Sequence, residues 1–245
     1  MTDVEKLAKI LSQSSSAVFF GGAGMSTESG IPDFRSANGI YNQKLNQTFS
    51  PEEMASHSFF LRHPEEFFAF YRARFVYLDA APNAGHIALA ELERRGNLSA
   101  VVTQNIDGLH QIAGSKVVYE LHGSIRRSYC VKCGAKYGVE FVMENIPVPH
   151  CVKCGGIVKP DVVLYGEQLD NETVSNSIQA IAAADTLIVG GTSLIVYPAA
   201  GLIDYFRGRH LILINKTATH ADADAELVIR ENIGATLSKA VALLS

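Results

Sequence analysis

The sequence predicts an α/β fold built on a doubly wound parallel sheet, with a smaller domain that contains a zinc-binding module and a helical module. Three observations support this prediction. Short, continuously apolar runs recur along the 245 residues, helical segments separate most of them, and the four cysteines form two Cys-x-x-Cys pairs. Continuous apolar runs of this kind are typical of strands that are buried on both faces of a parallel sheet.

The chain is expected to open with an amphipathic helix followed by a buried strand. Val4, Leu7, Ala8 and Leu11 recur at helical spacing behind Thr2, a residue type that favours helix starts. The following strand is expected at 17–20, where four apolar residues precede a glycine pair. Similar runs predict further strands at 100–102, 117–119, 162–164, 187–189 and 211–214.

Helix starts and stops are also visible between the predicted strands. Ser50 followed by Pro51 is typical of an N-cap with proline at the first helical position, and Pro64 opens a second helix in the same way. A third helix is expected over 83–95, where Gly96 ends it.

Composition limits the classes of function. Hydrophobic residues make up 47% of the chain and the net charge is −4, so the sequence fits a compact globular protein and disfavours phosphate-driven binding of nucleic acid. The amino terminus lacks a basic region followed by an apolar core, so we expect no secretory signal and a cytoplasmic protein. The apolar stretch 186–206 contains glycines and a proline and is expected to form a strand and a helix, not a membrane span. We expect a monomer.

The cysteines indicate one zinc ion. Cys130 and Cys133 form one pair, Cys151 and Cys154 form the other, and seventeen residues separate the two pairs. In a reducing compartment this spacing favours a tetrahedral Cys₄ site over disulfides, and four thiolates leave no coordination position for a catalytic water. The zinc is therefore expected to be structural.

Two interruptions of the α/β pattern predict the domain organisation. Residues 36–77 are helical and loop-rich, and residues 124–159 hold the cysteines, so these two segments are expected to form the small domain. The large domain would then be discontinuous and consist of 1–35, 78–123 and 160–245.

Most of the polar or glycine-rich clusters follow predicted strands directly. They include 22–26, 103–107, 121–123, 191–193 and Asn215. Because ligands of open α/β sheets bind beyond the carboxyl ends of the strands, these clusters are expected to meet in one crevice.

Two of these clusters suit a dinucleotide. The turn Gly22-Ala23-Gly24 would let the backbone approach a diphosphate, although it lacks the third glycine of G-x-G-x-x-G. A second glycine-rich turn, at 190–193, follows another predicted strand. Together the two turns favour a Rossmann-like domain that holds its cofactor with several loops.

At this point the residues resemble a known family. The segment 22–27 (GAGMST), followed by 30–35 (GIPDFR), resembles the cofactor-binding loop of the sirtuins, which are NAD-dependent protein-lysine deacylases. The resemblance extends over essentially the whole chain and is closest to compact members of bacterial or archaeal type. Further matching blocks, in family order, are 103–110 (TQNIDGLH), 121–123 (LHG), both cysteine pairs, 159–163 (KPDVV), 165–167 (YGE) and 191–193 (GTS).

The resemblance implies a set of site residues. His122 would be the general base, for which an ordinary histidine pKa is suitable, and Asn105 would help to position the ribose. Asp107 would hold the nicotinamide carboxamide together with Ile106, although a helix cap is its alternative role. NAD⁺ would be bound by Gly22, Ala23, Gly24, Thr27, Phe34, Arg35, Gln104, Asn105, Ile106, Asp107, His122, Gly191, Thr192, Ser193, Asn215 and Ile233. Val162, Val163, Tyr165, Gly166 and Glu167 would bind an acyl-lysine peptide as an added strand.

The resemblance also implies a reaction. The acyl-lysine oxygen would attack C1′ of the nicotinamide ribose and expel nicotinamide, and His122 would then deprotonate a ribose hydroxyl. The products would be the free lysine, nicotinamide and O-acyl-ADP-ribose. An apolar lid that contains Phe34 would exclude water from the reacting carbon.

Three other functional classes explain less of the sequence. A dehydrogenase would leave 30–35 and 104–107 without a purpose. A zinc deaminase would use His63-Pro64-Glu65, but His150 separates Pro149 from Cys151, where that motif needs proline directly before cysteine. A non-catalytic zinc-ribbon adaptor would leave the crevice motifs unexplained.

The acyl group is the open question. Tyr71 and Arg74 lie three residues apart on one predicted helix and resemble the Tyr-x-x-Arg pair of sirtuins that prefer succinyl-lysine or malonyl-lysine. Those members usually carry alanine where this chain has Thr27, and they lack Pro32-Asp33. Acetyl-lysine is therefore the expected substrate, with desuccinylation or demalonylation as the alternative.

Overall fold

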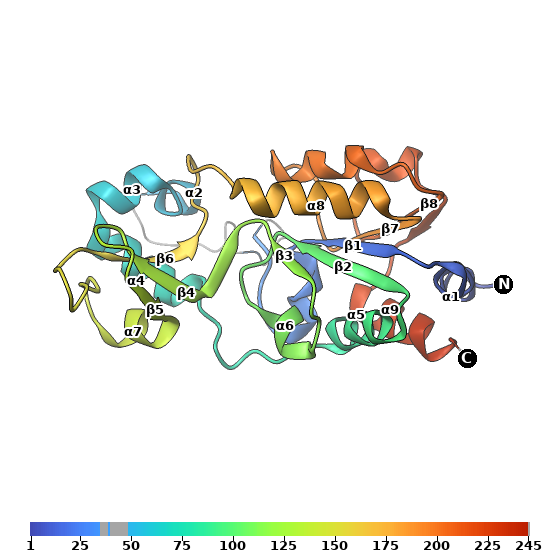
Figure 1. Ribbon diagram of the computed structural model, residues 1–245, viewed down its shortest axis with the longest axis horizontal. Coiled ribbons are helices and arrows are strands. Elements are labelled where there is room, and N and C mark those ends of the chain that lie inside the picture. The colour runs from blue at the N-terminus through green and yellow to red at the C-terminus, as the bar shows by residue number, and fades with distance from the viewer. Residues whose placement is uncertain (35–38, 40–48, 245) are drawn as a thin grey trace.

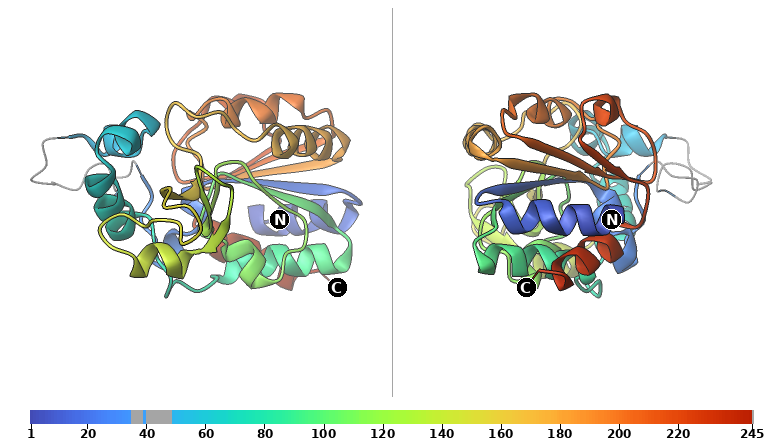
Figure 2. Two further views of the ribbon diagram at one scale, coloured as in Figure 1. Left: turned by 60° about the vertical axis from the view of Figure 1, so that its left-hand side comes forward. Right: turned by 90° about the vertical axis from the view of Figure 1, so that its right-hand side faces the viewer.

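The computed structural model describes residues 1–34, 39 and 49–244. Its larger part is a parallel sheet between two layers of helices, and its smaller part lies beyond one end of the strands (Figures 1 and 2). Six strands have the order β3-β2-β1-β7-β8-β9, and all neighbouring pairs are parallel. The strands are β1 (Ala17–Gly21), β2 (Leu98–Thr103), β3 (Val118–Glu120), β7 (Thr186–Gly190), β8 (His210–Ile214) and β9 (Leu227–Ile229).

Both faces of this sheet are covered, which explains the continuously apolar strands. Side chains alternate along a strand, so Phe19 packs on one face while Val18 and Phe20 pack on the other. The first face contacts α1 (Asp3–Gln13), α5 (Ala84–Arg95) and α9 (Ile233–Ala242), and α6 (Leu109–Ala113) packs against α5. The second face is covered by α8 (Asn171–Ala183) and the 3₁₀ helix η4 (Ala199–Tyr205).

The predicted helix boundaries are confirmed where the sequence has capping residues. Thr2 and Glu5 form a capping box at the start of α1, and the hydroxyl of Ser50 accepts from the Glu53 N–H at the start of α2 (Pro51–Met54). Gly96 ends α5 with a φ of 84°, which suits glycine. The stretch 186–206 divides into β7 and η4, and among the described residues no helix is long and apolar enough to cross a membrane.

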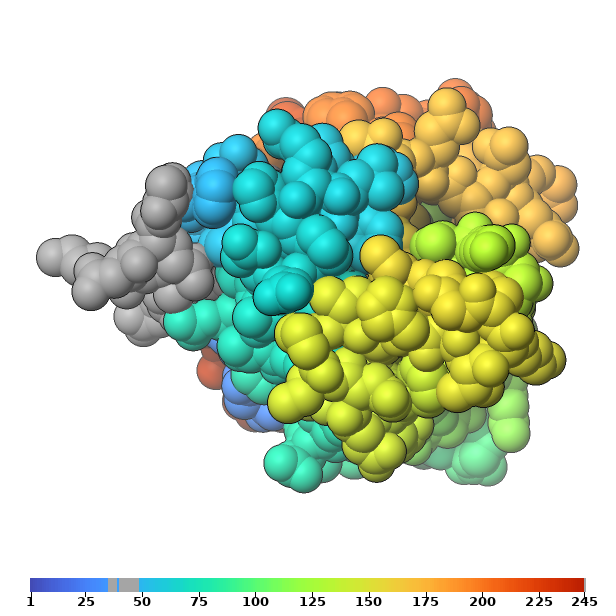
Figure 3. Space-filling view, turned by 90° about the vertical axis from the view of Figure 1, so that its left-hand side faces the viewer, coloured from blue at the N-terminus to red at the C-terminus, as the bar shows by residue number. Residues whose placement is uncertain are grey.

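The small part of the molecule has its own antiparallel sheet and an aromatic core. Its strands have the order β5-β4-β6, and rings of Phe59, Phe60, Phe67 and Phe68 pack at its centre. The space-filling view shows the cysteine-bearing segment directly beside α3 and α4 (Figure 3). Its elements are α3 (His57–Arg62), α4 (Pro64–Arg74), β4 (Gly123–Cys130), β5 (Lys136–Gly138), α7 (Val139–Glu144) and β6 (Val158–Val162).

One predicted strand was wrong in position and partner. The apolar run 162–164 does not form a strand of the parallel sheet, because β6 ends at Val162 and pairs antiparallel with β4. The residues after Val162 continue as an extended segment that is held by single hydrogen bonds instead of a regular ladder. The domain boundaries expected from the sequence remain a prediction. Residues 123 and 160–162, which that prediction places in the large domain, pair within the small sheet through β4 and β6.

Candidate active site

A cleft of about 1020 Å³ lies where the carboxyl ends of the parallel strands meet the small part of the molecule. Its volume is at the upper end of the range for small-molecule sites. The strand-end clusters expected to converge do so here. The lining includes Gly22, Ala23, Gly24, Thr27, Phe34, Gln104, Asn105, Ile106, Asp107, His122, Val162, Val163, Tyr165, Gly166, Glu167, Gly191, Thr192, Ser193, Asn215 and Ile233.

The two glycine-rich turns are packed against each other by their backbones. The N–H of Gly24 donates to the carbonyl of Gly191 at 2.8 Å, and the N–H of Gly22 donates to Gly190 at 3.3 Å. A Cβ on Gly24 would lie 2.7 Å from the Cα of Gly191, closer than real contacts allow. The glycines therefore permit contact between the loops, as well as the open approach for a diphosphate that the sequence indicated.

Asp107 is fixed by a hydrogen-bond network at the cleft floor. Its Oδ1 accepts from the N–H of Leu109, the first residue of α6, at 2.9 Å, although the N-cap of that helix is Gly108 and not Asp107. Its Oδ2 accepts from the hydroxyl of Ser26 at 2.7 Å. The Nδ2 of Asn105 donates to the same Ser26 hydroxyl at 3.0 Å. Asn105 and Asp107 are both nearly buried, so this network holds two polar side chains in defined orientations.

The tautomer of His122 follows from its hydrogen bond to a backbone carbonyl. Its Nδ1 lies 2.9 Å from the carbonyl oxygen of Gln104, and because a carbonyl can only accept, Nδ1 must carry the proton. Nε2 is then the basic nitrogen. Burial lowers the pKa of His122 from its ordinary 6.5, and the Gln104 carbonyl opposes this shift. The imidazole is therefore neutral and ready to accept a proton near pH 7.

Gln104 connects two parts of the cleft. While its backbone carbonyl accepts from His122, its side-chain Nε2 donates to the hydroxyl of Thr192 at 3.0 Å. Thr192 is buried, and its hydroxyl in turn accepts from the N–H of Leu194 at 3.2 Å. The loop after β2 is thus tied both to His122 and to the second glycine-rich turn.

The far end of the cleft is formed by Asn215 and by the start of α9. The Nδ2 of Asn215 donates to the carbonyl of Thr217, and the guanidinium of Arg230 donates to the carbonyls of both residues. Ile233 is buried at the first position of α9. The carboxylate of Glu28 accepts from the N–H of Gly234 at 2.7 Å, so an acidic side chain satisfies this helix start.

The segment expected to bind substrate runs along the cleft and is held from both sides. The N–H of Val163 donates to the carbonyl of His122 at 3.0 Å. On the other side, Tyr165 donates to the carbonyl of Ala55 and accepts from the N–H of His57, which forms a short parallel bridge. The segment therefore joins the neighbourhood of His122 to the α2–α3 junction.

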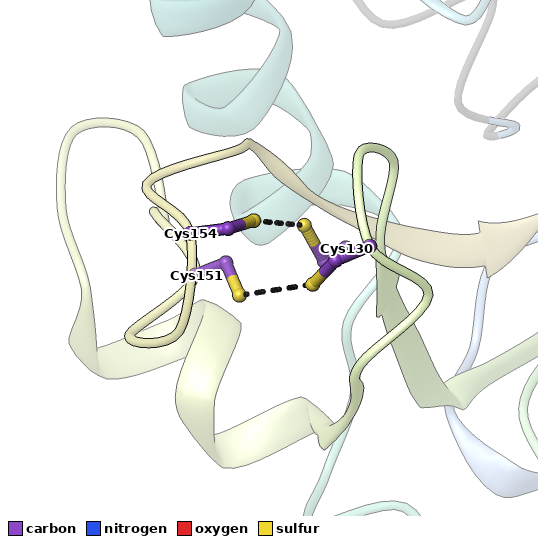
Figure 4. A group of neighbouring side chains, drawn as sticks. Cys130, Cys151 and Cys154 are labelled. Carbon is purple, nitrogen blue, oxygen red and sulfur yellow. Dashed lines mark hydrogen bonds between the residues drawn. The ribbon is translucent and has the colours of Figure 1, made fainter.

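The four cysteines meet in the small part, and none of them lines the cleft. Figure 4 shows Cys130, Cys151 and Cys154 with their sulfur atoms in one cluster. Their Sγ atoms all lie within 4.8 Å of one another, with Cys130 and Cys154 3.4 Å apart and Cys133 and Cys151 3.6 Å apart. These separations exceed a disulfide bond of about 2.05 Å. They match the edges of roughly 3.8 Å in a tetrahedron of zinc–sulfur bonds. The N–H groups of Lys132 and Lys153 donate to Cys130 and Cys151, as suits thiolate sulfurs.

Two expectations from the sequence concern Arg35 and the pair of Tyr71 and Arg74. Arg35 lies outside the described residues. Tyr71 is buried in the aromatic core, where its ring stacks on Phe67, and only Arg74 of the pair lines the cleft. Among the described residues the hydroxyl of Tyr71 has no hydrogen-bond partner, and burial raises its pKa.

Several residues of the cleft lining were not predicted from the sequence. Lys216 follows Asn215 directly at the end of a predicted strand, so the strand-end rule could have found it. Glu28, Tyr77 and Glu231 gave no such signal, because only the folded chain brings them to the cleft.

The parallel sheet, the paired glycine-rich turns and the cleft at the carboxyl edge define a nucleotide-binding α/β protein with an added four-cysteine module. The family model described as the Sir2 family matches residues 22–198, which is well over half of the chain. The protein therefore belongs to the Sir2 family.

Relatives and solved structures agree with this assignment. The chain is 62% identical to an NAD-dependent protein deacetylase of Clostridium perfringens over 97% of this chain and 98% of the relative, and 60% identical to that of Clostridium acetobutylicum over the same shares. A solved Sir2 structure with p53 peptide and NAD⁺ superimposes with a TM-score of 0.86 at 39% identity, covering 99% of this chain and 98% of that one. A Sir2 variant with deacetylated p53 peptide and 3′-O-acetyl ADP ribose gives a TM-score of 0.90 at 38% identity, covering 98% of each chain.

Proposed function

We propose that this protein is an NAD-dependent protein-lysine deacetylase that transfers the acetyl group of a lysine side chain to ADP-ribose, with release of nicotinamide and free lysine and consumption of one water. One observation carries the proposal: a neutral histidine, His122, holds a basic Nε2 in a cleft that also contains two packed glycine-rich turns. The similar proteins named as NAD-dependent protein deacetylases support the same activity.

The residues fit NAD⁺ as the co-substrate. The glycine-rich turns and Thr192 would hold the diphosphate and sugars together with Gln104, Ser193 and Asn215, and Ile233 would contact the adenine. Asp107, whose carboxylate retains free lone pairs, would accept from the nicotinamide amide beside Ile106. NAD⁺ supplies an electrophilic sugar carbon to which the acyl oxygen can bind.

The protein's own groups would then act around that carbon. The Nε2 of His122 would accept a proton from a ribose hydroxyl, and the Gln104 carbonyl would stabilise the imidazolium through Nδ1–H. Asn105, fixed through Ser26, would position the ribose. Phe34, whose ring packs edge-on against Phe75 at 6.0 Å, would help to keep water away.

We further propose that Cys130, Cys133, Cys151 and Cys154 bind one structural Zn²⁺, which the sulfur geometry supports. The ion would close the small sheet and take no part in the reaction. A cytoplasmic monomer is the proposed state of the protein, and a reducing compartment would keep these thiols available to the metal.

The geometry favours acetyl-lysine over an acidic acyl group. Because Tyr71 is packed into the aromatic core, it does not line the cleft beside Arg74 as a succinyl-binding pair would require. Thr27 donates its hydroxyl to the carbonyl of Gly24 at 3.0 Å, so its methyl group adds bulk at the cofactor loop. A buried carboxylate without a well-placed partner is costly.

The activity is tested by incubating the purified protein with NAD⁺ and matched acetyl-lysine and succinyl-lysine peptides, with detection of products by mass. We expect nicotinamide, free lysine and O-acetyl-ADP-ribose, with a higher kcat/KM for the acetyl peptide. Formation of NADH would instead indicate a dehydrogenase. Faster succinyl turnover that is lost in Arg74→Ala would overturn the acyl preference.

A further inference from the structure

A buried ammonium group lies beneath the segment that runs along the cleft. Lys159, in β6, is only 3% exposed. Its Nζ donates to the carbonyl of Val162 at 2.8 Å and lies 3.0 Å from Oε2 of Glu167. A buried cation needs both a counter-charge and hydrogen-bond acceptors, and this one has both within eight residues of its own chain.

The carboxylate of Glu167 is fully engaged by the protein. Its Oε2 accepts from Lys159 and also from the backbone N–H of Leu164 at 2.8 Å. Its Oε1 lies 2.6 Å from Nδ1 of His57, the first residue of α3. Burial raises the pKa of Glu167, but the Leu164 N–H, the Lys159 charge and His57 outweigh it, so the net pKa is lowered and the group stays ionised.

These side-chain contacts complete a set of backbone bonds around the same segment. Val163 is bonded to the carbonyl of His122, and Tyr165 is bonded to Ala55 and His57. The carbonyl of Val162 is bound by Lys159, and the N–H of Leu164 is bound by Glu167. Neither group takes part in the backbone bonds of Val163 and Tyr165. Val162 also pairs with Gly123 of β4, and the carbonyl of Leu164 accepts from the N–H of Glu167 at 2.9 Å. The ion pair therefore adds a side-chain contact to the Val162 carbonyl and one to the Leu164 N–H.

We propose that Glu167, with Lys159 as its buried counter-ion and His57 as its link to α3, is a positioning residue that holds residues 162–165 as a preformed strand for the peptide. This inference rests on the proposed function and refines it, because Glu167 then acts through the segment and not as a ligand of the peptide. A preformed strand lowers the entropy cost of peptide binding, since the segment need not be ordered when the peptide pairs with it.

The first test is the peptide KM of Glu167→Gln. We expect the peptide KM to rise about tenfold, the amount that corresponds to the loss of one charged hydrogen bond. The KM for NAD⁺ and the zinc content should stay unchanged, which a general loss of structure would not allow. Glu167→Gln leaves Lys159 without a counter-charge, which destabilises the fold. The double variant Lys159→Met/Glu167→Gln removes both charges, so its peptide KM can be measured without an unpaired buried charge.

The second test compares two similar contacts. His57 and His210 each place Nδ1 2.6 Å from a glutamate oxygen, but the His210–Glu226 contact lies outside the cleft lining. His57→Ala should raise the peptide KM in the same direction as Glu167→Gln, while His210→Ala should not. If Glu167 instead bound the peptide directly, Glu167→Gln would raise the KM while His57→Ala and Lys159→Met left it unchanged, which would overturn the proposal.

A readout without activity separates this inference from the proposed function. Amide hydrogen exchange of residues 163–167 should become faster in Glu167→Gln and in His57→Ala, and should stay as in the wild type in His210→Ala. Unchanged exchange in the first two variants would overturn the positioning role. Absence of NAD-dependent deacetylation by the wild type would instead refute the proposed function. The exchange result would then still test whether Glu167 and His57 hold the segment in place.

Discussion

The two parts of the molecule that meet at the cleft are stabilised in different ways. The parallel sheet buries aliphatic side chains on both faces, and its loops are joined by backbone hydrogen bonds between glycines. The small antiparallel sheet has only three strands, and it depends on an aromatic core, four clustered cysteines and a buried ion pair. A small sheet buries little area by itself, so it needs such additional links. Chelators should therefore weaken the small part and leave the parallel sheet intact.

Loss of the metal should have the largest effect, and it should be confined to the small part. Cys151→Ala removes one of four ligands, and structural zinc contributes on the order of 10 kcal/mol to the folding of small metal domains. We expect less than one zinc per chain by metal analysis and fast amide exchange over 124–159. Val152→Ala, an exposed neighbour in the same turn, is the matched control and should retain the metal. Full zinc content in Cys151→Ala would contradict the Cys₄ site.

The cleft chemistry should depend on a residue of the larger part. His122→Ala should lower kcat/KM by about 10²–10⁴, the usual contribution of a general base, while NAD⁺ still binds. Because the pKa of His122 is lowered, the wild-type rate should rise with pH, and the midpoint of this rise should lie below the ordinary histidine pKa of 6.5. Steady-state kinetics across pH measure both effects, with His210→Ala as the control. Near-wild-type turnover in His122→Ala would remove this residue from the mechanism.

Acid should destabilise the larger part, which contains the parallel sheet, through two buried histidines. His86 and His110 pack ring to ring at 4.7 Å, and burial lowers their pKa values to about 4 and about 3. The unfolded chain binds these protons near pH 6.5 and the folded chain does not, so stability is lost as pH falls below 6.5. His110 alone should cost roughly 3 kcal/mol at pH 4.

Urea unfolding at pH 7 and pH 4 measures this loss. His110→Leu should lose less stability between the two pH values, because leucine binds no proton. The variant should still fold, because Nδ1 and Nε2 of His110 have no hydrogen-bond partners among the described residues and an apolar side chain leaves no polar group unsatisfied. An equal loss in His110→Leu and wild type would assign the acid sensitivity to other groups.

The smallest predicted effect tests whether the glycine turns are locked together. Gly24→Ala forces a Cβ against the backbone of Gly191, and such overpacking costs about 1–3 kcal/mol. We expect NAD⁺ affinity to fall by about tenfold to a hundredfold, as measured by calorimetry. Gly201→Ala is the control, because its Cβ would meet only the Tyr197 ring at an ordinary 3.5 Å. Equal affinity in both variants would argue against the loop contact.

The comparison also explains which features the sequence could predict. Strands buried on both faces, such as β1 and β7, appear as uninterrupted apolar runs, and their ends locate the cleft without further information. The half-exposed strands β4 and β5 carry arginine, lysine and serine and give no such run. The run 162–164 is apolar for a different reason, because its residues face the cleft and the small core. The prediction therefore places it in the wrong sheet.

Long-range polar contacts could not be predicted at all. No local pattern indicates that Lys159 is buried against Glu167, or that the helix at 57–62 supplies a partner for it. Residues of the aromatic helices also reach the cleft, as Arg74 and Phe75 do, because of how the helices pack and not because of their spacing. The cysteine cluster is the exception, since metal binding imposes a spacing that is visible in the sequence.

The hydrogen bond between His122 and Gln104 has a consequence for mutational robustness. The acceptor that selects the tautomer of His122 is a main-chain carbonyl, so no substitution of the residue 104 side chain removes it. The side chain of Gln104 serves a separate contact, to Thr192. Nucleotide affinity and proton acceptance can therefore change independently at one position, and a variant library at residue 104 should contain proteins that bind the nucleotide differently while His122 still holds its proton on Nδ1.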